Sequence, residues 1–210
     1  MKQLAGERAA LDIVRFIDEV AIMRELQHPN VVRFVGTVWE PSAMLVLERL
    51  HGSLREALRD RTTLEPLVIA ADVARGMWYL HELCLSHRDL KAANVLLDAD
   101  GRAKVGDLGL TRCVTTGMAS AVGTSLWMAP EARSGRARYD ERCDLFSFAV
   151  LLLELVDYEL VHGELIHVGT LVGPDFETPD LAWLGDSWAL PFVQACLVRN
   201  GCSGRNVCNV

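Results

Sequence analysis

The sequence predicts an α+β protein in which a first unit of one helix and short strands precedes a mainly helical unit. Apolar residues recur with a helical period from Asp12 to Gln27. Two strand-like runs follow at 31–38 and 44–50, and the turn-prone residues Glu40-Pro41-Ser42 separate them. Beyond Gly52 the apolar pattern becomes mainly helical. The change of pattern divides the chain near residue 50.

The first unit contains one amphipathic helix between strands. We interpret Met1 to Leu4 as the end of a strand that precedes the helix from Asp12. The sequence His28-Pro29-Asn30 ends this helix, because the residue before a proline is pushed out of the helical region. The two strand-like runs complete the unit.

The second unit is predicted to alternate helices with one small hairpin. Leu54 to Leu58 indicates a short helix, and Leu67 to Cys84 indicates a long one. Val95 to Leu97 and Lys104 to Val105 flank a turn and predict a β-hairpin. From Asp144 the sequence is apolar nearly all round a helix, so we expect this helix to lie inside the larger unit.

Two stretches have weaker patterns. Residues 110–128 are rich in Thr, Ser, Gly and Ala without a firm period, and we expect a mobile loop there. The tail from Asp157 shows weak helical signals around Leu190 to Val198. The tail is the least informative part of the chain.

Composition excludes several classes of protein. With 210 residues and 50% hydrophobic content, the chain is long and apolar enough to bury a core. The net charge of −7 provides no basic surface for nucleic acid, which is not an expected partner. The six cysteines form no C-x-x-C pair, so we expect thiols and no zinc site. The longest apolar run, Leu145 to Val156, is too short for a membrane span, and no signal peptide opens the chain. We expect a cytoplasmic location.

The stretch from His87 to Leu97, HRDLKAANVLL, carries the strongest chemical signal. Asp89, Lys91 and Asn94 place a carboxylate, a cation and an amide on one loop, and the apolar run after them predicts a buried strand that holds the loop. Such a set of side chains suits a substrate hydroxyl together with a metal phosphate.

Two further motifs follow at fixed positions, Asp107-Leu108-Gly109 and Ala129-Pro130-Glu131. In this order after HRDLKAAN, they make the chain resemble a protein kinase domain. Lys91 and Thr124 resemble serine/threonine kinases more than tyrosine kinases, nearest the tyrosine-kinase-like group. The resemblance implies a two-lobed kinase-like fold, with an incomplete β-rich N-lobe at 1–50 and a mainly helical C-lobe at 51–210.

The resemblance also implies roles for the catalytic residues. Asp107 would bind the magnesium ion that bridges the outer phosphates of ATP, and Asn94 would bind a second ion. Asp89 would orient the substrate hydroxyl and accept its proton, and Lys91 would neutralise the transferring phosphate. The implied cofactors are ATP and Mg²⁺, and the implied partner is a protein substrate with Ser or Thr hydroxyls.

The nucleotide site is implied by a second set of residues. Lys2 and Glu19 have a spacing similar to the strand lysine and helix glutamate of kinases, which hold the phosphates. A solvated N-terminal lysine is the alternative interpretation of Lys2. Leu47 resembles the gatekeeper, and the backbone from Glu48 to Leu50 resembles the hinge that binds adenine. Leu96 is assigned to the same site.

His87, the first residue of the stretch from His87 to Leu97, is interpreted as structural. By resemblance, His87 packs with Met23, Phe34 and Leu108 in the spine that connects the lobes, and Asp144 anchors it.

Kinases carry a Gly-rich loop, G-x-G-x-x-G, before the strand lysine, and no residue precedes Met1 here. We therefore expect an N-terminally truncated kinase domain that binds ATP weakly and turns over slowly. Two functions stay open at this point. The first is a protein serine/threonine kinase, and the second is a catalytically weak or inactive kinase-like interaction module.

Overall fold

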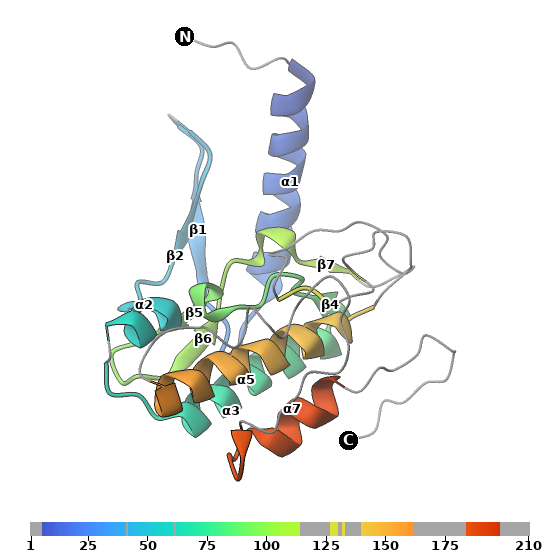
Figure 1. The fold of residues 1–210 in the computed structure, drawn as a ribbon. Coiled ribbons are helices and arrows are strands. Elements are labelled where there is room, and N and C mark those ends of the chain that lie inside the picture. The colour runs from blue at the N-terminus through green and yellow to red at the C-terminus, as the bar shows by residue number, and fades with distance from the viewer. Residues whose placement is uncertain are drawn as a thin grey trace.

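The computed structural model describes residues 6–40, 42–60, 62–113, 127–129, 132, 140–161 and 184–197. Within them, helices and small antiparallel sheets share one core, so the α+β fold class is confirmed (Figure 1). The sheets have the strand orders β1-β2, β3-β5-β6 and β4-β7.

The first unit consists of a long helix beside a hairpin. Helix α1 spans Gly6–Glu25 and so begins before the predicted residue. Strands β1 (Phe34–Val38) and β2 (Met44–Leu47) pair antiparallel, and both are shorter than predicted. The run from residue 31 is shortened because Val31 forms a parallel bridge with Val105 and the Val32 N–H donates to the Val105 carbonyl.

The second unit begins with a capped helix. Strand β3 (Gly52–Ser53) leads into α2 (Leu54–Arg59), where Ser53 and Glu56 form a reciprocal capping box. Helix α3 (Pro66–Glu82) has its proline in the first turn, where no backbone N–H donor is required. Both helices lie where the apolar period predicted them.

The predicted hairpin is confirmed as β5 (Val95–Leu97) and β6 (Ala103–Val105). Strand β3 pairs with β5 on its other side, which makes a three-stranded sheet. The 3-10 turns η1 (Ala92–Asn94) and η2 (Leu108–Leu110) flank this sheet in the chain.

The buried helix is α5 (Cys143–Val161), and its described side chains up to Val156 are mostly buried, as its sequence predicted. Helix α7 (Leu190–Leu197) packs against it, and α3 lies on another side (Figure 1). No helix among the described residues is both long and apolar enough to cross a membrane.

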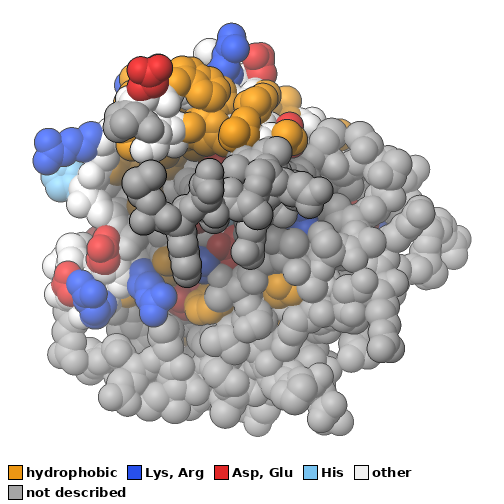
Figure 2. Space-filling view, turned by 90° about the horizontal axis from the view of Figure 1, so that it is seen from above, with side chains coloured by type: hydrophobic (Ala, Val, Ile, Leu, Met, Phe, Trp, Pro, Cys, Tyr) orange, Lys and Arg blue, Asp and Glu red, His pale blue; other side chains and the backbone are white. Residues whose placement is uncertain are grey.

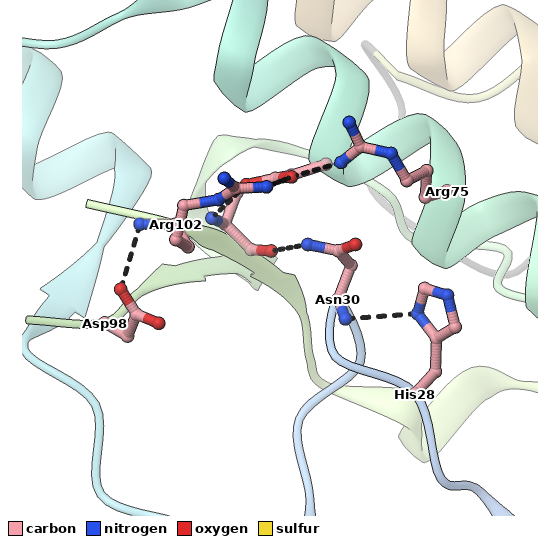
Figure 3. A network of polar contacts seen from close by, with 7 residues as sticks. His28, Asn30, Arg75, Asp98 and Arg102 are labelled. Atoms are coloured by element: carbon pink, nitrogen blue, oxygen red, sulfur yellow. Dashed lines mark hydrogen bonds and ion pairs between the residues drawn. The ribbon is translucent and has the colours of Figure 1, made fainter. Parts of the chain in front are cut away.

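The connection after α1 joins the two units through polar contacts (Figure 3). The Asn30 carbonyl accepts from the Val105 N–H at 2.9 Å, and Asn30 Nδ2 donates to the Ala103 carbonyl at 2.9 Å. A Cβ atom at Gly76 of α3 would lie only 2.4 Å from the Asn30 backbone oxygen. Only glycine at this position therefore lets α3 come this close to the segment after α1. The His28 ring stacks on Tyr79 with centroids 4.9 Å apart.

A buried carboxylate of α3 completes this junction. Asp72 has no exposed surface, and it accepts hydrogen bonds from Arg102, Arg75 and the Ala103 N–H. Burial alone would raise the pKa of Asp72, but the Arg102 guanidinium and the other donors lower it below its ordinary value. Strand β6 is therefore fixed to helix α3.

The hairpin has an exposed apolar face. Seen from above, where α1 and the hairpin point toward the viewer, hydrophobic side chains gather on the surface (Figure 2). The exposed large side chains of the hairpin and its turn are Val35, Val38, Trp39, Met44 and Val46. The division of the chain into lobes at residue 50 stays a prediction.

Candidate active site

The catalytic segment is defined here as residues 86–94, between strand β4 (Leu85–Ser86) and β5. Strand β4 pairs with β7 (Arg112–Cys113), so the segment is tethered at both ends by short ladders. Helix α3 delivers the chain to β4 through a turn in which Cys84 adopts a left-handed backbone with φ 54°. Helix α3 therefore leads into the segment through β4, and the buried strand β5 follows it.

Asp144 of α5 holds the start of the catalytic segment. Its Oδ2 accepts from the His87 N–H at 2.9 Å and from the Ser86 hydroxyl at 3.1 Å. Its Oδ1 accepts from the Arg88 N–H at 2.9 Å, and Arg88 has a left-handed backbone with φ 70°. These bonds fix a strained conformation at the residue before Asp89.

A histidine of α3 pairs with the same carboxylate. His81 Nε2 lies 2.9 Å from Asp144 Oδ2. Burial alone would raise the pKa of Asp144, but the hydrogen bond and charge of His81 and the hydrogen bond from the Arg88 N–H lower it. The carboxylate is stable there because each of its oxygens has donors.

His87 links the two motifs that the sequence singled out. Its Nε2 lies 2.9 Å from the Gly106 carbonyl, which only accepts, so Nε2 carries the proton. Its Nδ1 then accepts from the Asp89 N–H at 3.2 Å. His87 is fully buried, as are Met23 and Leu108. The predicted anchoring of His87 by Asp144 is confirmed. Its packing with Met23, Phe34 and Leu108 stays a prediction.

Asp89, Lys91 and Asn94 meet at one carboxylate oxygen. Lys91 Nζ lies 2.6 Å from Asp89 Oδ2, and Asn94 Nδ2 donates to the same oxygen at 2.9 Å. Asn94 Nδ2 also donates to the Asp89 carbonyl at 2.8 Å. Asp89 and Asn94 are each 7% exposed. The structure therefore brings together the three polar residues of the predicted catalytic set, in a fixed orientation.

A backbone hydrogen bond connects Gly106, the residue before Asp107, to the catalytic segment. The Gly106 N–H donates to the Asn94 carbonyl at 2.8 Å, which places the two loops side by side. Asp107 has a left-handed backbone, with φ 54° and ψ 65°, and its side chain is exposed. A Cβ at Gly109 would lie 3.5 Å from Asp107 Oδ1 and from both Glu19 carboxylate oxygens. Glu19 of α1 therefore reaches the Asp107 loop. Its predicted pairing with Lys2 stays a prediction.

The residues assigned to adenine line the junction of hairpin and sheet. Leu47 and Leu96 are half-buried, and Leu96 Cδ1 packs where a Gly106 Cβ would lie. The Glu48 N–H donates to the Arg33 carbonyl at 3.0 Å, so this N–H is bound within the chain. The assignment of residues 48–50 to adenine stays a prediction. Lys2 lies outside the described residues.

The donor set fits a magnesium ion. Both hydrogen bonds of the Asn94 amide run from its nitrogen to oxygens of Asp89, so Oδ1 is assigned as the remaining acceptor. This oxygen and the exposed Asp107 carboxylate are the hard ligands that Mg²⁺ takes alongside phosphate and water. Among the described residues, no group of three His, Cys, Asp or Glu side chains forms a separate metal site.

The comparisons with known proteins agree with this geometry. The family model for protein tyrosine and serine/threonine kinase matches residues 1–164. The chain belongs to the protein kinase family. A chain in the crystal structure of the yeast RNA Pol II CTD kinase CTDK-1 complex superposes on it with a TM-score of 0.64. That match has 25% identity and covers 69% of this chain and 50% of the solved one.

Curated kinases are more similar in sequence. Serine/threonine-protein kinase STY17 of Arabidopsis thaliana is 38% identical over 182 residues, which is 82% of this chain and 32% of the relative. Megakaryocyte-associated tyrosine-protein kinase of Mus musculus is 40% identical over 149 residues, 68% of this chain and 29% of the relative. This kinase chain thus spans about a third of the length of either relative.

Sequence reasoning missed three residues that hold the kinase site. Lys104 Nζ forms an ion pair with Glu48 Oε1 at 2.8 Å, and His81 pairs with Asp144. Glu154 of α5 accepts a hydrogen bond from the catalytic segment. Glu154 had a detectable signal, because a lone carboxylate inside an apolar helix requires a partner. The two pairs had none, because their members lie far apart in the chain.

Proposed function

We propose that this chain is the catalytic part of a protein serine/threonine kinase, which transfers the γ-phosphoryl group of MgATP to protein hydroxyls. The observation that carries the proposal is the convergence of Lys91 and Asn94 on one oxygen of the buried Asp89. Phosphoryl transfer depends mainly on positioning and charge, and this cluster provides both.

The protein groups would act as follows. Asp89, held by its two donors, orients the substrate hydroxyl and accepts its proton. Lys91 places a positive charge beside Asp89, where it neutralises the transferring phosphate. Asn94 Oδ1 and the Asp107 carboxylate would hold the magnesium ions, which bring the transferable phosphoryl group into place and neutralise its charge. The hydrogen bonds of Gly106 to the His87 ring and to the Asn94 carbonyl keep these residues in position.

The nucleotide would lie between the hairpin and the β3-β5-β6 sheet. Leu47 and Leu96 would contact the base, and the Leu50 backbone and Glu48 carbonyl would hydrogen-bond its edge. Lys2 and Glu19 are proposed to hold the phosphates, and the approach of Glu19 to the Asp107 loop supports its part.

The proposal is tested by transfer of labelled phosphate from MgATP to a generic protein substrate. We compare the chain with its Asp89→Asn and Asp107→Asn variants and expect both to lose roughly 100-fold or more in rate. A variant of an exposed residue, Glu82→Gln, controls for handling. Equal signal from all four proteins contradicts the proposal and leaves a kinase-like interaction module.

The type of hydroxyl is tested in the same experiment. Lys91, two residues after Asp89, supports serine and threonine. Acid hydrolysis of the labelled substrate should release phosphoserine and phosphothreonine. Phosphotyrosine as the main product would contradict the proposed substrate class and place the activity nearer the mouse relative.

A further inference from the structure

Glu154 is a buried carboxylate that the proposed mechanism does not use. It lies on α5, is 2% exposed, and faces two segments that are far apart in sequence. Its Oε2 accepts from the Trp127 indole Nε1–H at 2.9 Å and from the Ala92 N–H at 3.3 Å. This one oxygen therefore connects Ala92 of the catalytic segment with Trp127. Met128 and Ala129, which follow Trp127, are buried.

The second side of Trp127 is held by the same helix. Ser147 Oγ donates to the Trp127 carbonyl at 2.6 Å, and Ser147 lies two turns before Glu154 on the same face of α5. The indole and the carbonyl of Trp127 are therefore both fixed to α5. Because Ala92 shares the Glu154 oxygen, a shift of the Trp127 segment is transmitted to the catalytic segment through a single atom.

The carboxylate is unfavourable where it lies. Burial raises the pKa of Glu154 to about 7, although the Trp127 and Ala92 hydrogen bonds and the charges of Arg55 and Lys91 act against this. A glutamine would accept both bonds without the cost of a buried charge. The two hydrogen bonds alone therefore do not account for an ionisable group at this position.

The charged groups that act on Glu154 identify the further role. Arg55 comes from α2, and Lys91 comes from the catalytic segment. The Lys91 ammonium is bound to Asp89 Oδ2 and also lies in the field of Glu154. Two carboxylates on different elements then act on one ammonium, Asp89 through an ion pair and Glu154 through its charge alone.

We propose that Glu154 is a positioning residue, which orients Lys91 by its charge and couples the catalytic segment to Trp127. The proposal rests on the proposed kinase function, because Lys91 is assigned there to the transferring phosphate. Near neutral pH, protonation of Glu154 removes the charge that acts on Lys91 and turns an acceptor into a donor. Phosphoryl transfer should then weaken as the pH falls below neutrality.

The first test follows the coupling without any activity. The Trp127 indole N–H signal, assigned by its loss in Trp127→Phe, is recorded by NMR from about pH 5 to about pH 9. We expect it to titrate with a midpoint of about 7, together with the Ala92 amide. Both titrations should vanish in Glu154→Gln, while the exposed Trp78 indole stays constant. A Trp127 signal that is silent, or that titrates equally in Glu154→Gln, overturns the proposal.

The second test uses labelled phosphate transfer. Glu154→Gln should lower kcat by about 10-fold at neutral pH and above, with KM for ATP unchanged, because it misplaces Lys91 and not the nucleotide. The wild-type rate should fall as the pH drops below neutrality, the rate of Glu154→Gln should not show this fall, and Glu82→Gln should match the wild type. An active wild type whose pH profile the variant shares overturns the proposal. An inactive wild type contradicts the proposed kinase function, and the NMR titration then decides the coupling alone.

Discussion

The catalytic segment is held by polar contacts inside the protein, whereas the β1-β2 hairpin leaves apolar side chains exposed. Ser86, His87 and Arg88 bind one buried carboxylate, Asp144. In the hairpin, Val35 is 58% exposed and Met44 is 48% exposed. The comparison indicates that the geometry of the catalytic segment is determined by contacts with helix α5 and not by the hairpin.

The largest expected effect on stability comes from removing Asp144, the carboxylate that holds the start of the catalytic segment. Asp144→Ala should lower the free energy of unfolding by about 3 to 5 kcal/mol, because the His87 and Arg88 N–H groups lose their acceptor inside the core. Urea denaturation measures the change. Asp140→Ala, which removes a partly exposed carboxylate at the start of the same helix, should cost about 1 kcal/mol. Similar losses in the two variants would break the comparison.

The next effect is a pH dependence of stability. The folded pKa of Glu154 is about 7, above its ordinary value of 4.5, so the folded protein binds the extra proton between these values. Stability from this group is present at low pH and is lost as the pH rises toward 7, by up to about 3 kcal/mol. Glu154→Gln should remove this loss and flatten the difference between urea midpoints at about pH 5 and about pH 8. An unchanged difference would show that Glu154 titrates near its ordinary value.

An intermediate effect is expected where the two regions meet. The pKa of Glu48 is lowered, because its hydrogen bonds and ion pair with Lys104 outweigh the effect of burial. Because the pKa of Glu48 is lower in the folded protein, this carboxylate stabilises the fold at pH values above its unfolded pKa of 4.5. This contribution to stability is lost as the pH falls below 4.5 and through the folded pKa. Lys104→Met should therefore cost about 1 to 2 kcal/mol at neutral pH and much less in acid. A double-mutant cycle with Glu48→Gln isolates the pair, and a coupling near zero would mean that the hairpin is held by its apolar contacts alone.

The smallest effect is expected on the exposed hairpin face. Met44→Thr and Val46→Thr should each change the free energy of unfolding by less than about 0.5 kcal/mol, because both side chains are exposed on the surface of the hairpin. Leu47→Thr on the half-buried face is the matched control and should cost more. A loss of more than about 2 kcal/mol at Met44 would show that this face is covered in solution.

Local patterns predicted the long elements and the catalytic residues. Helices α3 and α5 follow from runs whose apolar period is long enough to be unambiguous, and the β5-β6 hairpin follows from its turn. Asp89, Lys91 and Asn94 lie within six residues of each other, so their meeting on one loop required no knowledge of the fold.

The pairings that align these parts were not predicted. Strands β3, β4 and β7 have two residues each, which is too short to show a period of two. The parallel bridge from Val31 to Val105 shortened a strand that the apolar run had extended to residue 31. In both cases the partner, and not the local sequence, determined the pairing.

The sequence alone determined which side chains the site contains, because motif order and local spacing are carried by the chain itself. Only the tertiary structure decided how they are held. Asp144 reaches residues 56 to 58 positions away, and Glu154 reaches Ala92 across 62. Contacts at such separations depend on how helices pack around a common core, and packing leaves no signature in a short stretch of sequence.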